Sequence, residues 1–269
     1  LDTVMYTLAG LNNPVLGWGR VDETWSFMET LAQLGGETWF RLGDRDLALH
    51  IHRTARLKSG GRLTEVNREL QRRLGLPDAP ILMATDDPLR TRVRTPEGWM
   101  EFQPWFVGAQ AKPEVLEVEF VGAQSARVSA EVTEAILSAE LIVIAPSNPL
   151  ISIAPILAVN GVREAIASAR SRGVQVIGVS PIVAGKAIKG PADRMLRAAG
   201  LPSSPVGVAR ALPGLFDTLL VEESDLTDAL RAELAPLVPR IAGATTVMRD
   251  DDARLSLAQQ LLQAASDAA

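Results

Sequence analysis

The chain has 269 residues, of which 47% are hydrophobic and 22% charged, and its formal net charge at pH 7 is −5. This composition is typical of a folded protein with a large core and excludes disorder of the whole chain. The negative charge argues against bulk electrostatic binding to nucleic acid or to an anionic membrane. The chain has no cysteine, which excludes disulfides, thiolate catalysis and cysteine-ligated metal centres.

Histidine is scarce, with only His50 and His52 in the chain. Their spacing places them on different faces of a helix, so they cannot chelate one ion as an i, i+4 pair would. A Ser-His-Asp hydrolase would have to use one of them, and we expect instead a surface or partly buried histidine at each position. No apolar run reaches the roughly 20 residues of a membrane span, and we see no secretory signal, so we expect a cytoplasmic protein.

Helical periodicity dominates the first part of the chain. Apolar residues recur at helical spacing over residues 24–34, 46–58 and 64–74, and a glycine follows each run. We expect Asp46 to cap the second helix and Thr64 the third. All five tryptophans lie in the first 110 residues, which indicates either a bulkier core there or a flat pocket for a planar ligand.

An alternating pattern of apolar and polar residues follows. Residues 91–95 and 99–107 flank a Pro-Glu-Gly segment and predict a hairpin, and residues 114–121 predict a further strand. The sequence therefore predicts a small antiparallel β portion.

The second half of the chain predicts α/β structure. Residues 141–145 and 174–179 are continuous apolar runs, typical of strands covered on both faces, and a predicted helix at 162–172 lies between them. Strand, helix and strand in this order indicate a right-handed parallel βαβ unit. Further expected elements are a helix at 131–139, a strand at 217–221 and a closing helix at 252–265.

Both apolar runs end in small polar residues. Ser147 and Asn148 follow the first run, and Ser180 follows the second. Ligands bind at the carboxyl ends of the strands in an open parallel sheet, and short loops with hydroxyl, amide and backbone N–H groups suit a phosphate. Lys186 and Lys189 would add positive charge. The alternative is that proline and serine only end the strands here.

Two charged segments are further candidates for a site. Gly43-Asp44-Arg45-Asp46 is the densest charge cluster, and it predicts either a site or an ordinary helix start. Asp86-Asp87-Pro88 predicts either a Mg²⁺ site, since hard cations prefer carboxylate oxygens, or a turn.

Six segments of the chain, in this order, are similar to those of one known family. They are Leu1-Asp2-Thr3, Phe40-Arg41-Leu42-Gly43-Asp44-Arg45-Asp46, Asp86-Asp87-Pro88, Phe102-Gln103, Pro146-Ser147-Asn148-Pro149 with Ser152-Ile153, and Ser180-Pro181-Ile182. Together they resemble the 2-phospho-L-lactate transferase family of coenzyme F420 biosynthesis. The resemblance covers essentially the whole chain, and the Gly-Asp-Arg-Asp and Pro-Ser-Asn-Pro segments are its strongest parts.

The resemblance implies an α/β fold, with a Rossmann-like parallel sheet that has helices on both faces, a helical insertion and a small antiparallel β portion. We expect a single transferase domain over residues 1–269. The helical insertion is expected at about 15–78, the β portion at about 90–122, and the α/β core at about 128–269 together with the N-terminal segment.

The resemblance also implies a reaction. A phospho-three-carbon-acid group (2-phospho-L-lactate, enolpyruvyl phosphate or phosphoglycerate) would move from its guanosine diphosphate-linked donor to the ribityl hydroxyl of the deazaflavin FO. GMP would be released, with Mg²⁺ as the cofactor. Such a transfer needs positioning and charge neutralisation more than a covalent nucleophile, which fits a chain without cysteine.

Particular residues take roles by the same resemblance. Asp2 matches the second aspartate of the family's Pro-Asp-Leu-Asp-Thr segment and is expected to be catalytic and to lie at the metal. The candidates for binding FO are Asp2, Arg41, Asp44, Arg45 and Asp46. The candidates for binding the nucleotide and its phosphates are Ser147, Asn148, Pro149, Ser152 and Ser180. Some family members carry Lys at the place of Arg41 and contact FO with it, and related members vary at this position. The planar fork of Arg is a different donor from the point charge of Lys.

Family members begin with a strand and a Gly-Gly-Thr-Gly-type loop ahead of the equivalent of Leu1. We therefore expect an N-terminal segment to be missing from this sequence, and a molecule that truly starts at Leu1 to be inactive. The expected partners are FO and the guanylylated phospho-acid, with no nucleic acid and no membrane, and a homodimer is expected.

Two other functions are alternatives to the transferase. The first alternative is a nucleotide-sugar-binding regulatory protein of the same superfamily, without transferase activity. Its strand-end loop resembles Gly-Pro-Gly-Ser-Leu-Tyr-Thr-Ser, whereas residues 146–152 here read Pro-Ser-Asn-Pro-Leu-Ile-Ser, which favours the transferase. The second, a nicotinamide dehydrogenase, needs G-x-G-x-x-G after a strand, and Gly17-Trp18-Gly19 lacks the third glycine.

Overall fold

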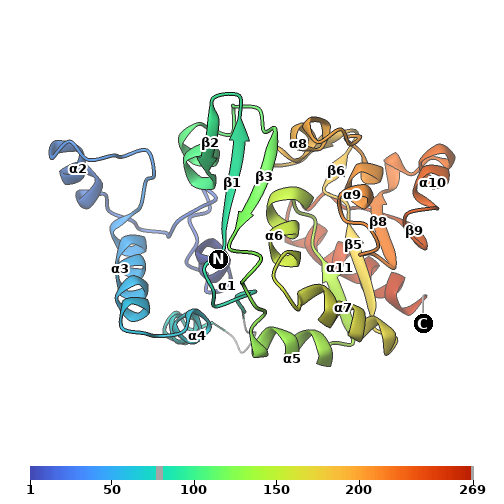
Figure 1. Ribbon diagram of the computed structural model, residues 1–269, viewed down its shortest axis with the longest axis horizontal. Helices are drawn as coiled ribbons and strands as arrows, with labels where there is room; N and C mark the ends of the chain where they lie inside the picture. The colour runs from blue at the N-terminus through green and yellow to red at the C-terminus, as the bar shows by residue number, and fades with distance from the viewer. Residues whose placement is uncertain (77–80, 268–269) are drawn as a thin grey trace. The chain divides into compact units, whose positions relative to one another are not determined.

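The structure is a computed structural model that describes residues 1–76 and 81–267 (Figure 1). The chain forms two compact units, Leu1–Asp86 and Asp87–Ala269. The N-terminal segment thus belongs to the helical unit, whereas the sequence placed it with the α/β core. The predicted end of the insertion, at 77–78, lies outside the described residues, and the single transferase domain stays a prediction.

The first unit is helical. It contains α1 (Asp2–Leu8), α2 (Ser26–Gln33), α3 (Asp44–Lys58) and α4 (Leu63–Arg73). A small core of buried side chains from α1, α3 and α4 joins three of these helices: Met5, Tyr6, Leu49, Val66 and Leu70. The three helices predicted from periodicity are confirmed, and the short α1 was not predicted as a helix.

The predicted caps of α3 and α4 are wrong. The helix α3 has Gly43 as its N-cap, and the carboxylate of Glu23 accepts hydrogen bonds from the backbone N–H groups of Arg45 and Asp46 at 2.8 and 2.9 Å. Arg62 is the N-cap of α4, and the backbone N–H of Thr64 donates to a more distant carboxylate. In both helices an acid remote in sequence satisfies the free donors of the first turn, so local spacing could not reveal the cap.

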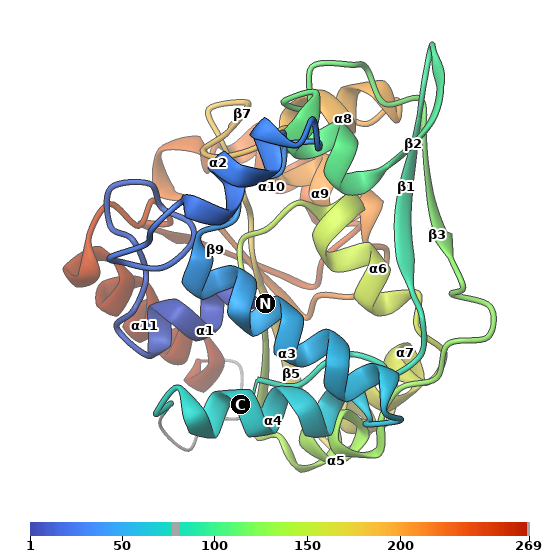
Figure 2. The ribbon, with the colours of Figure 1, turned by 90° about the vertical axis from the view of Figure 1, so that its left-hand side faces the viewer.

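The second unit opens with an antiparallel sheet. Its strands are β1 (Arg90–Thr95), β2 (Gly98–Glu101) and β3 (Glu117–Val121), drawn in green in Figure 2. Figure 1 shows their order, β2-β1-β3. This confirms the predicted β portion, but the second strand is shorter than expected. It ends at Glu101 because the backbone becomes helical at the next residue and continues into a π-helical turn, η1 (Pro104–Gly108), whose Trp105 packs in a buried cluster with Val93 of β1.

The centre of the second unit is a parallel sheet. Its strands are β4 (Leu141–Ile144), β5 (Gln175–Val179), β8 (Thr218–Glu222) and β9 (Arg240–Ala244), in the order β4-β5-β8-β9. All three pairings are parallel. The predicted Rossmann-like α/β fold is therefore confirmed, and β9 is a strand that the sequence analysis did not find.

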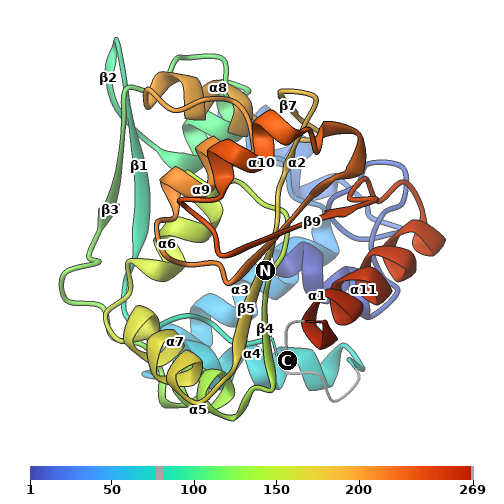
Figure 3. The same ribbon diagram turned by 90° about the vertical axis from the view of Figure 1, so that its right-hand side faces the viewer.

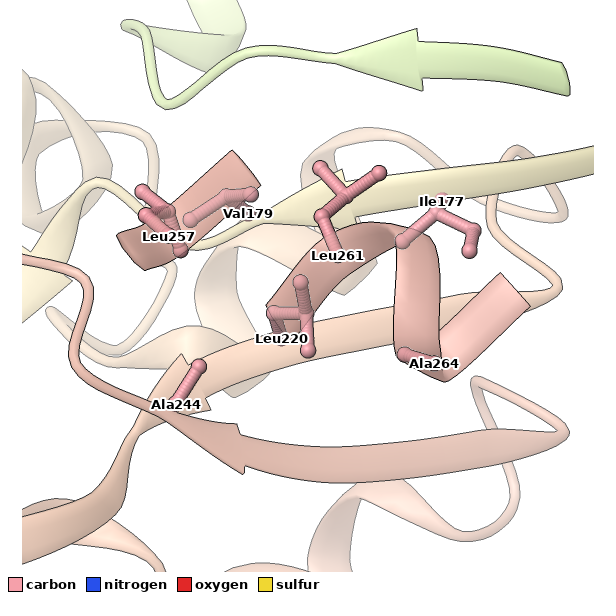
Figure 4. Packing of buried hydrophobic residues seen from close by; sticks show 7 residues of the cluster. All are labelled: Ile177, Val179, Leu220, Ala244, Leu257, Leu261 and Ala264. Atoms are coloured by element: carbon pink, nitrogen blue, oxygen red, sulfur yellow. The ribbon is translucent and has the colours of Figure 1, made fainter. Parts of the chain in front are cut away.

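Helices cover this sheet on both faces, as expected. Figure 3 shows α11 (Asp251–Ser266) on one side of the strands and α5 (Ala130–Ser138) and α7 (Val162–Ser171) on the other. Apolar side chains of α11 pack onto the strands in a buried cluster that is drawn in Figure 4: Ile177, Val179, Leu220, Ala244, Leu257, Leu261 and Ala264. This packing fixes the sheet whose carboxyl edge carries the candidate site.

The remaining described elements of the second unit are short. They are η2 (Pro149–Ile153), α6 (Ala154–Leu157), β6 (Ile182–Val183), β7 (Lys186–Ala187), α8 (Ala192–Ala198), α9 (Pro205–Ala211), η3 (Glu223–Asp225) and α10 (Asp228–Leu234). Within residues 1–76 and 81–267, none of the helices combines the length and the apolar character needed to cross a membrane.

Candidate functional site

A pocket of about 620 Å³ opens where three strands of the parallel sheet end. Its polar walls come from the segments that follow β4, β5 and β9, and two aromatic rings, one just before η1 and one within it, line it as well. The residues lining it include Phe102, Phe106, Ser147, Asn148, Ser152, Ser180, Lys189, Thr246 and Arg254. The volume lies in the range of small-molecule sites.

Asn148 shapes the pocket wall after β4. Its side-chain Oδ1 accepts hydrogen bonds from the backbone N–H groups of Leu150 and Ile151 at 2.9 and 3.3 Å, and its Nδ2 lies 3.4 Å from the sulfur of Met195. The amide oxygen is thus occupied in holding the first turn of η2. Pro149 is buried at the start of that turn and does not line the pocket.

The hydroxyl of Ser180 holds the turn after β5. It accepts from the backbone N–H of Ile182 at 3.2 Å and lies 3.3 Å from the carbonyl oxygen of the same residue, and its side chain is buried. Ser147, Asn148, Ser152 and Ser180, four of the five residues predicted for the nucleotide, therefore come together in one pocket.

Several lining residues were missed by the sequence analysis. Thr246, after β9, donates from its backbone N–H and its hydroxyl to Glu222 Oε2 at 2.7 and 2.6 Å. Arg254 reaches the pocket from the first turn of α11, where it also pairs with Asp251. Lys189, which was expected from the sequence only to add positive charge, also lines the pocket. Recognising β9 would have pointed to Thr246, because it follows that strand.

The residues predicted to bind FO lie in the first unit. Asp2 is in the first turn of α1, Asp44, Arg45 and Asp46 are in the first turn of α3, and Arg41 precedes that helix. Two of these carboxylates meet in what we call the acid cluster, which consists of Asp2, Tyr6, Asp46, His50 and Arg53.

Hydrogen bonds and ion pairs connect the members of the acid cluster. The Tyr6 hydroxyl donates to Asp46 Oδ1 at 2.6 Å. The guanidinium of Arg53 donates to both carboxylate oxygens of Asp2. The bond from Nη1 to Oδ2 is 3.0 Å long. The Nε2 atom of His50 lies 3.4 Å from Asp2 Oδ2 and 3.7 Å from Asp46 Oδ1. Sequence reasoning missed Tyr6, His50 and Arg53, although the i, i+4 spacing of Asp46 and His50 was visible.

Burial makes the phenol of Tyr6 an unusually weak acid. The pKa of its phenol is raised well above the ordinary value of 10.0, first because the ring is desolvated, and then because the hydroxyl donates to Asp46 and faces the negative charges of Asp46 and Asp2. Tyr6 is thus held as a neutral hydrogen-bond donor that orients the Asp46 carboxylate.

Asp44 and Arg41 connect α3 to the segment that precedes it. Asp44 accepts from the Thr24 hydroxyl at 2.6 Å and from the backbone N–H groups of Ser26 and Phe27, which are at the start of α2. These bonds, the one from Thr24 first, lower the pKa of Asp44 below 3.8. The guanidinium of Arg41 lies 4.5 Å from the ring centroid of Trp25. FO binding by these two residues stays a prediction.

Asp86 and Asp87 are both engaged in local structure. Asp86 accepts from Thr64 N at 2.7 Å and from the guanidinium of Arg62 at 2.6 Å, and Asp87 accepts from the backbone N–H of Arg127 at 2.8 Å. Burial would raise the pKa of Asp86, but the bonds from Thr64 and Arg62 outweigh it and lower the pKa. The geometry favours the turn over a Mg²⁺ site.

The acid cluster contains a set of candidate metal ligands. One oxygen each from Asp2 and Asp46 and one imidazole nitrogen of His50 lie within 4.8 Å of one another. Two carboxylates are suited to a hard divalent cation such as Mg²⁺, whereas an imidazole is more typical of a transition metal. The donors therefore fit a divalent cation, with Asp2 and Asp46 as the ligands that Mg²⁺ would prefer.

Comparison with known proteins identifies relatives of the whole chain. The family model of 2-phospho-L-lactate transferase CofD matches residues 1–264. A phosphoenolpyruvate transferase of Streptomyces griseus is 42% identical over 273 residues, which cover 99% of this chain and 84% of that protein. A phosphoenolpyruvate transferase of Mycolicibacterium smegmatis is 40% identical over 262 residues, with 92% and 79% covered.

Solved structures share the fold. A crystal structure of a UPF0052 family protein from Bacillus halodurans matches 96% of this chain and 82% of that chain with a TM-score of 0.57. The sequence identity is 16%, so this likeness concerns the fold alone.

Proposed function

Because this chain belongs to the 2-phospho-L-lactate transferase CofD family and is a transferase of that type, we propose that it acts in coenzyme F420 biosynthesis. It transfers a phospho-three-carbon-acid group from a guanosine diphosphate-linked donor to the ribityl hydroxyl of FO and releases GMP. Of the three acids expected from the sequence, the names of the relatives favour enolpyruvyl phosphate.

The charge of the pocket is the observation that supports this proposal most directly. Of the described residues that line it, Lys189 and Arg254 are cationic and none is acidic. In a chain with a net charge of −5, such a pocket is a local exception. Cations beside hydroxyl groups and strand ends suit the two phosphates of the donor.

The transfer breaks one phosphorus–oxygen bond and forms another. The ribityl oxygen of FO attacks the phosphorus that carries the acid, the bond from that phosphorus to the oxygen of the GMP phosphate breaks, and GMP leaves with the bonding electrons. The proton of the ribityl hydroxyl passes to a base, for which we propose the carboxylate of Asp2. Arg53 fixes the orientation of that carboxylate, whose oxygens keep further lone pairs for the substrate.

We also propose Mg²⁺ as the cofactor, held by Asp2 and Asp46 with His50 beside them. Mg²⁺ held by these residues would supply neutralisation of the charge that builds up on phosphate oxygens during transfer. The Tyr6 hydroxyl keeps one oxygen of Asp46 in place, so the carboxylate is oriented before any ligand arrives. A homodimer, and the absence of nucleic-acid and membrane partners, stay predictions from the sequence.

The test is to incubate the full-length protein with FO, Mg²⁺ and each of the three guanylylated acids in turn, and to measure GMP. We expect release with the enolpyruvyl donor above the other two. If no donor yields GMP and the protein instead binds a uridine nucleotide-sugar tightly, the regulatory alternative replaces the transferase.

A further inference from the structure

An aromatic pair forms one wall of the pocket. The rings of Phe102 and Phe106 are stacked, with centroids 5.3 Å apart and planes 11° from parallel. Both residues line the pocket, and Phe106 keeps 38% of its surface exposed. An exposed ring inside a concave site gains free energy when a flat, apolar surface covers it.

Packing against a buried tryptophan holds this pair in place. Both rings contact Trp105, which is 1% exposed and donates its indole N–H to the carbonyl oxygen of Pro113 at 3.0 Å. Phe106 belongs to the π-helical turn η1, a rare geometry that is frequent at functional sites. Phe102 also packs against the buried cluster around Val93, so Phe106 is the ring of the pair that is more available to a ligand.

The remaining lining residues indicate what kind of ligand would contact Phe106. Lys189 and Arg254 share the pocket with Phe106, together with small polar residues at the strand ends. A ligand that uses all of these groups carries a flat ring at one end and negative charge at the other. A nucleoside diphosphate has both features, whereas a deazaflavin with an unphosphorylated ribityl chain has only the ring.

We propose that the purine ring of the donor nucleotide stacks on Phe106, while its diphosphate lies toward Lys189 and Arg254. This inference rests on the proposed function and adds to it a residue that contacts the base. Stacking makes the affinity depend on the base, and the cations make it depend on the phosphates, so the two contributions are separable by experiment.

Equilibrium binding of GDP, inorganic pyrophosphate and FO to the wild type, F106A and F106W provides the test. We expect F106A to weaken GDP binding by roughly tenfold or more, the scale of losing a base–aromatic stack, and to leave pyrophosphate binding unchanged. We expect F106W, unlike F106A, to keep the wild-type affinity for GDP, because tryptophan offers a larger stacking surface. The matched control is W99A, which removes an aromatic ring that is 41% exposed on β2 and does not line the pocket.

Three results would overturn the inference. The first is unchanged GDP affinity in a folded F106A protein, as judged by circular dichroism. The second is an F106A variant that loses affinity for FO and not for GDP, which assigns the ring to the acceptor. The third is equal weakening of GDP and pyrophosphate. Failure of the proposed function has a different signature, since the wild type itself would then release no GMP from any donor.

Discussion

Tyr6 and Asp46 are 40 positions apart in the chain, yet the tyrosine hydroxyl donates a 2.6 Å hydrogen bond to the aspartate carboxylate. The bond joins α1 to the first turn of α3, next to the pair formed by Arg53 and Asp2. It therefore orients Asp46, while Arg53 orients Asp2, the other carboxylate that we propose for chemistry. A buried hydrogen bond to a charged group also stabilises the helical unit, by about 1.5–3 kcal/mol.

The pKa of Tyr6 can be measured by titration, because Tyr6 is the only tyrosine in the chain. Its pKa is raised above 10.0 by burial and by Asp46, so the folded protein keeps the phenol neutral through the range in which a free tyrosine ionises. We expect the tyrosinate absorbance near 295 nm to rise only well above pH 10, or together with unfolding. In urea the same titration should have its midpoint near 10. A midpoint near 10 in the folded protein would contradict the geometry of the acid cluster.

Replacing Asp2 tests the proposed base. Asp2→Asn keeps the size of the side chain and removes its capacity to accept a proton, so we expect turnover to fall by roughly 100-fold or more. GMP release measured at saturating donor and FO is the readout. Asp228→Asn is the matched control, because that aspartate is exposed at the start of α10 and lies outside both the acid cluster and the pocket lining. Turnover of the Asp2 variant at the wild-type rate would remove this residue from the chemistry.

The two pocket cations should act on donor binding more than on turnover. We expect Lys189→Gln and Arg254→Gln each to raise the KM for the donor by about tenfold and to weaken the salt dependence of GDP binding, because each removes a charge-assisted contact to phosphate. Lys186→Gln is the control, since Lys186 is exposed on β7 and does not line the pocket. A matching rise in KM for the control would show that only the overall charge matters.

Acid should destabilise the first unit through Asp44 and Asp86. Both have a pKa lowered below 3.8 in the folded state, Asp44 mainly by the Thr24 hydroxyl, and Asp86 by bonds from Thr64 and Arg62 that outweigh its desolvation. Each carboxylate therefore binds protons more tightly in the unfolded chain, so its stabilisation is complete above pH 3.8 and is lost as the pH falls below that value. Urea unfolding followed by tryptophan fluorescence between pH 2 and 6 measures this loss. Asp86→Asn should reduce the slope, and an unchanged slope would contradict the assignment.

The apolar pattern of the sequence predicted helices and strands correctly where it is strong along the chain itself. The apolar runs that became β4 and β5 and the helix between them were predicted within two residues at each end, because buried parallel strands have few polar positions. By contrast, β9 was missed, since Arg240–Ala244 contains a glycine and two alanines and lacks a strong apolar pattern. The residues that follow β9 were missed with it.

The candidate site could be predicted from the sequence only in part, for a related reason. The polar residues after β4 and β5 follow the strands directly, so topology alone brings Ser147 and Ser180 to one edge. The contacts of Tyr6 and Arg53 depend on how α1 packs against α3, which no local pattern encodes. The carboxylate of Asp44 was visible as a charge, but its use in holding the start of α2 depends on the path of the chain between residues 24 and 44.

The most direct measurement is the stoichiometry of the reaction, with the products identified by mass spectrometry. With FO, Mg²⁺ and the enolpyruvyl guanosine diphosphate donor, the account predicts one GMP for each FO that gains the mass of a phosphoenolpyruvyl group. Release of GDP in place of GMP, or GMP formed at the same rate without FO, would contradict it.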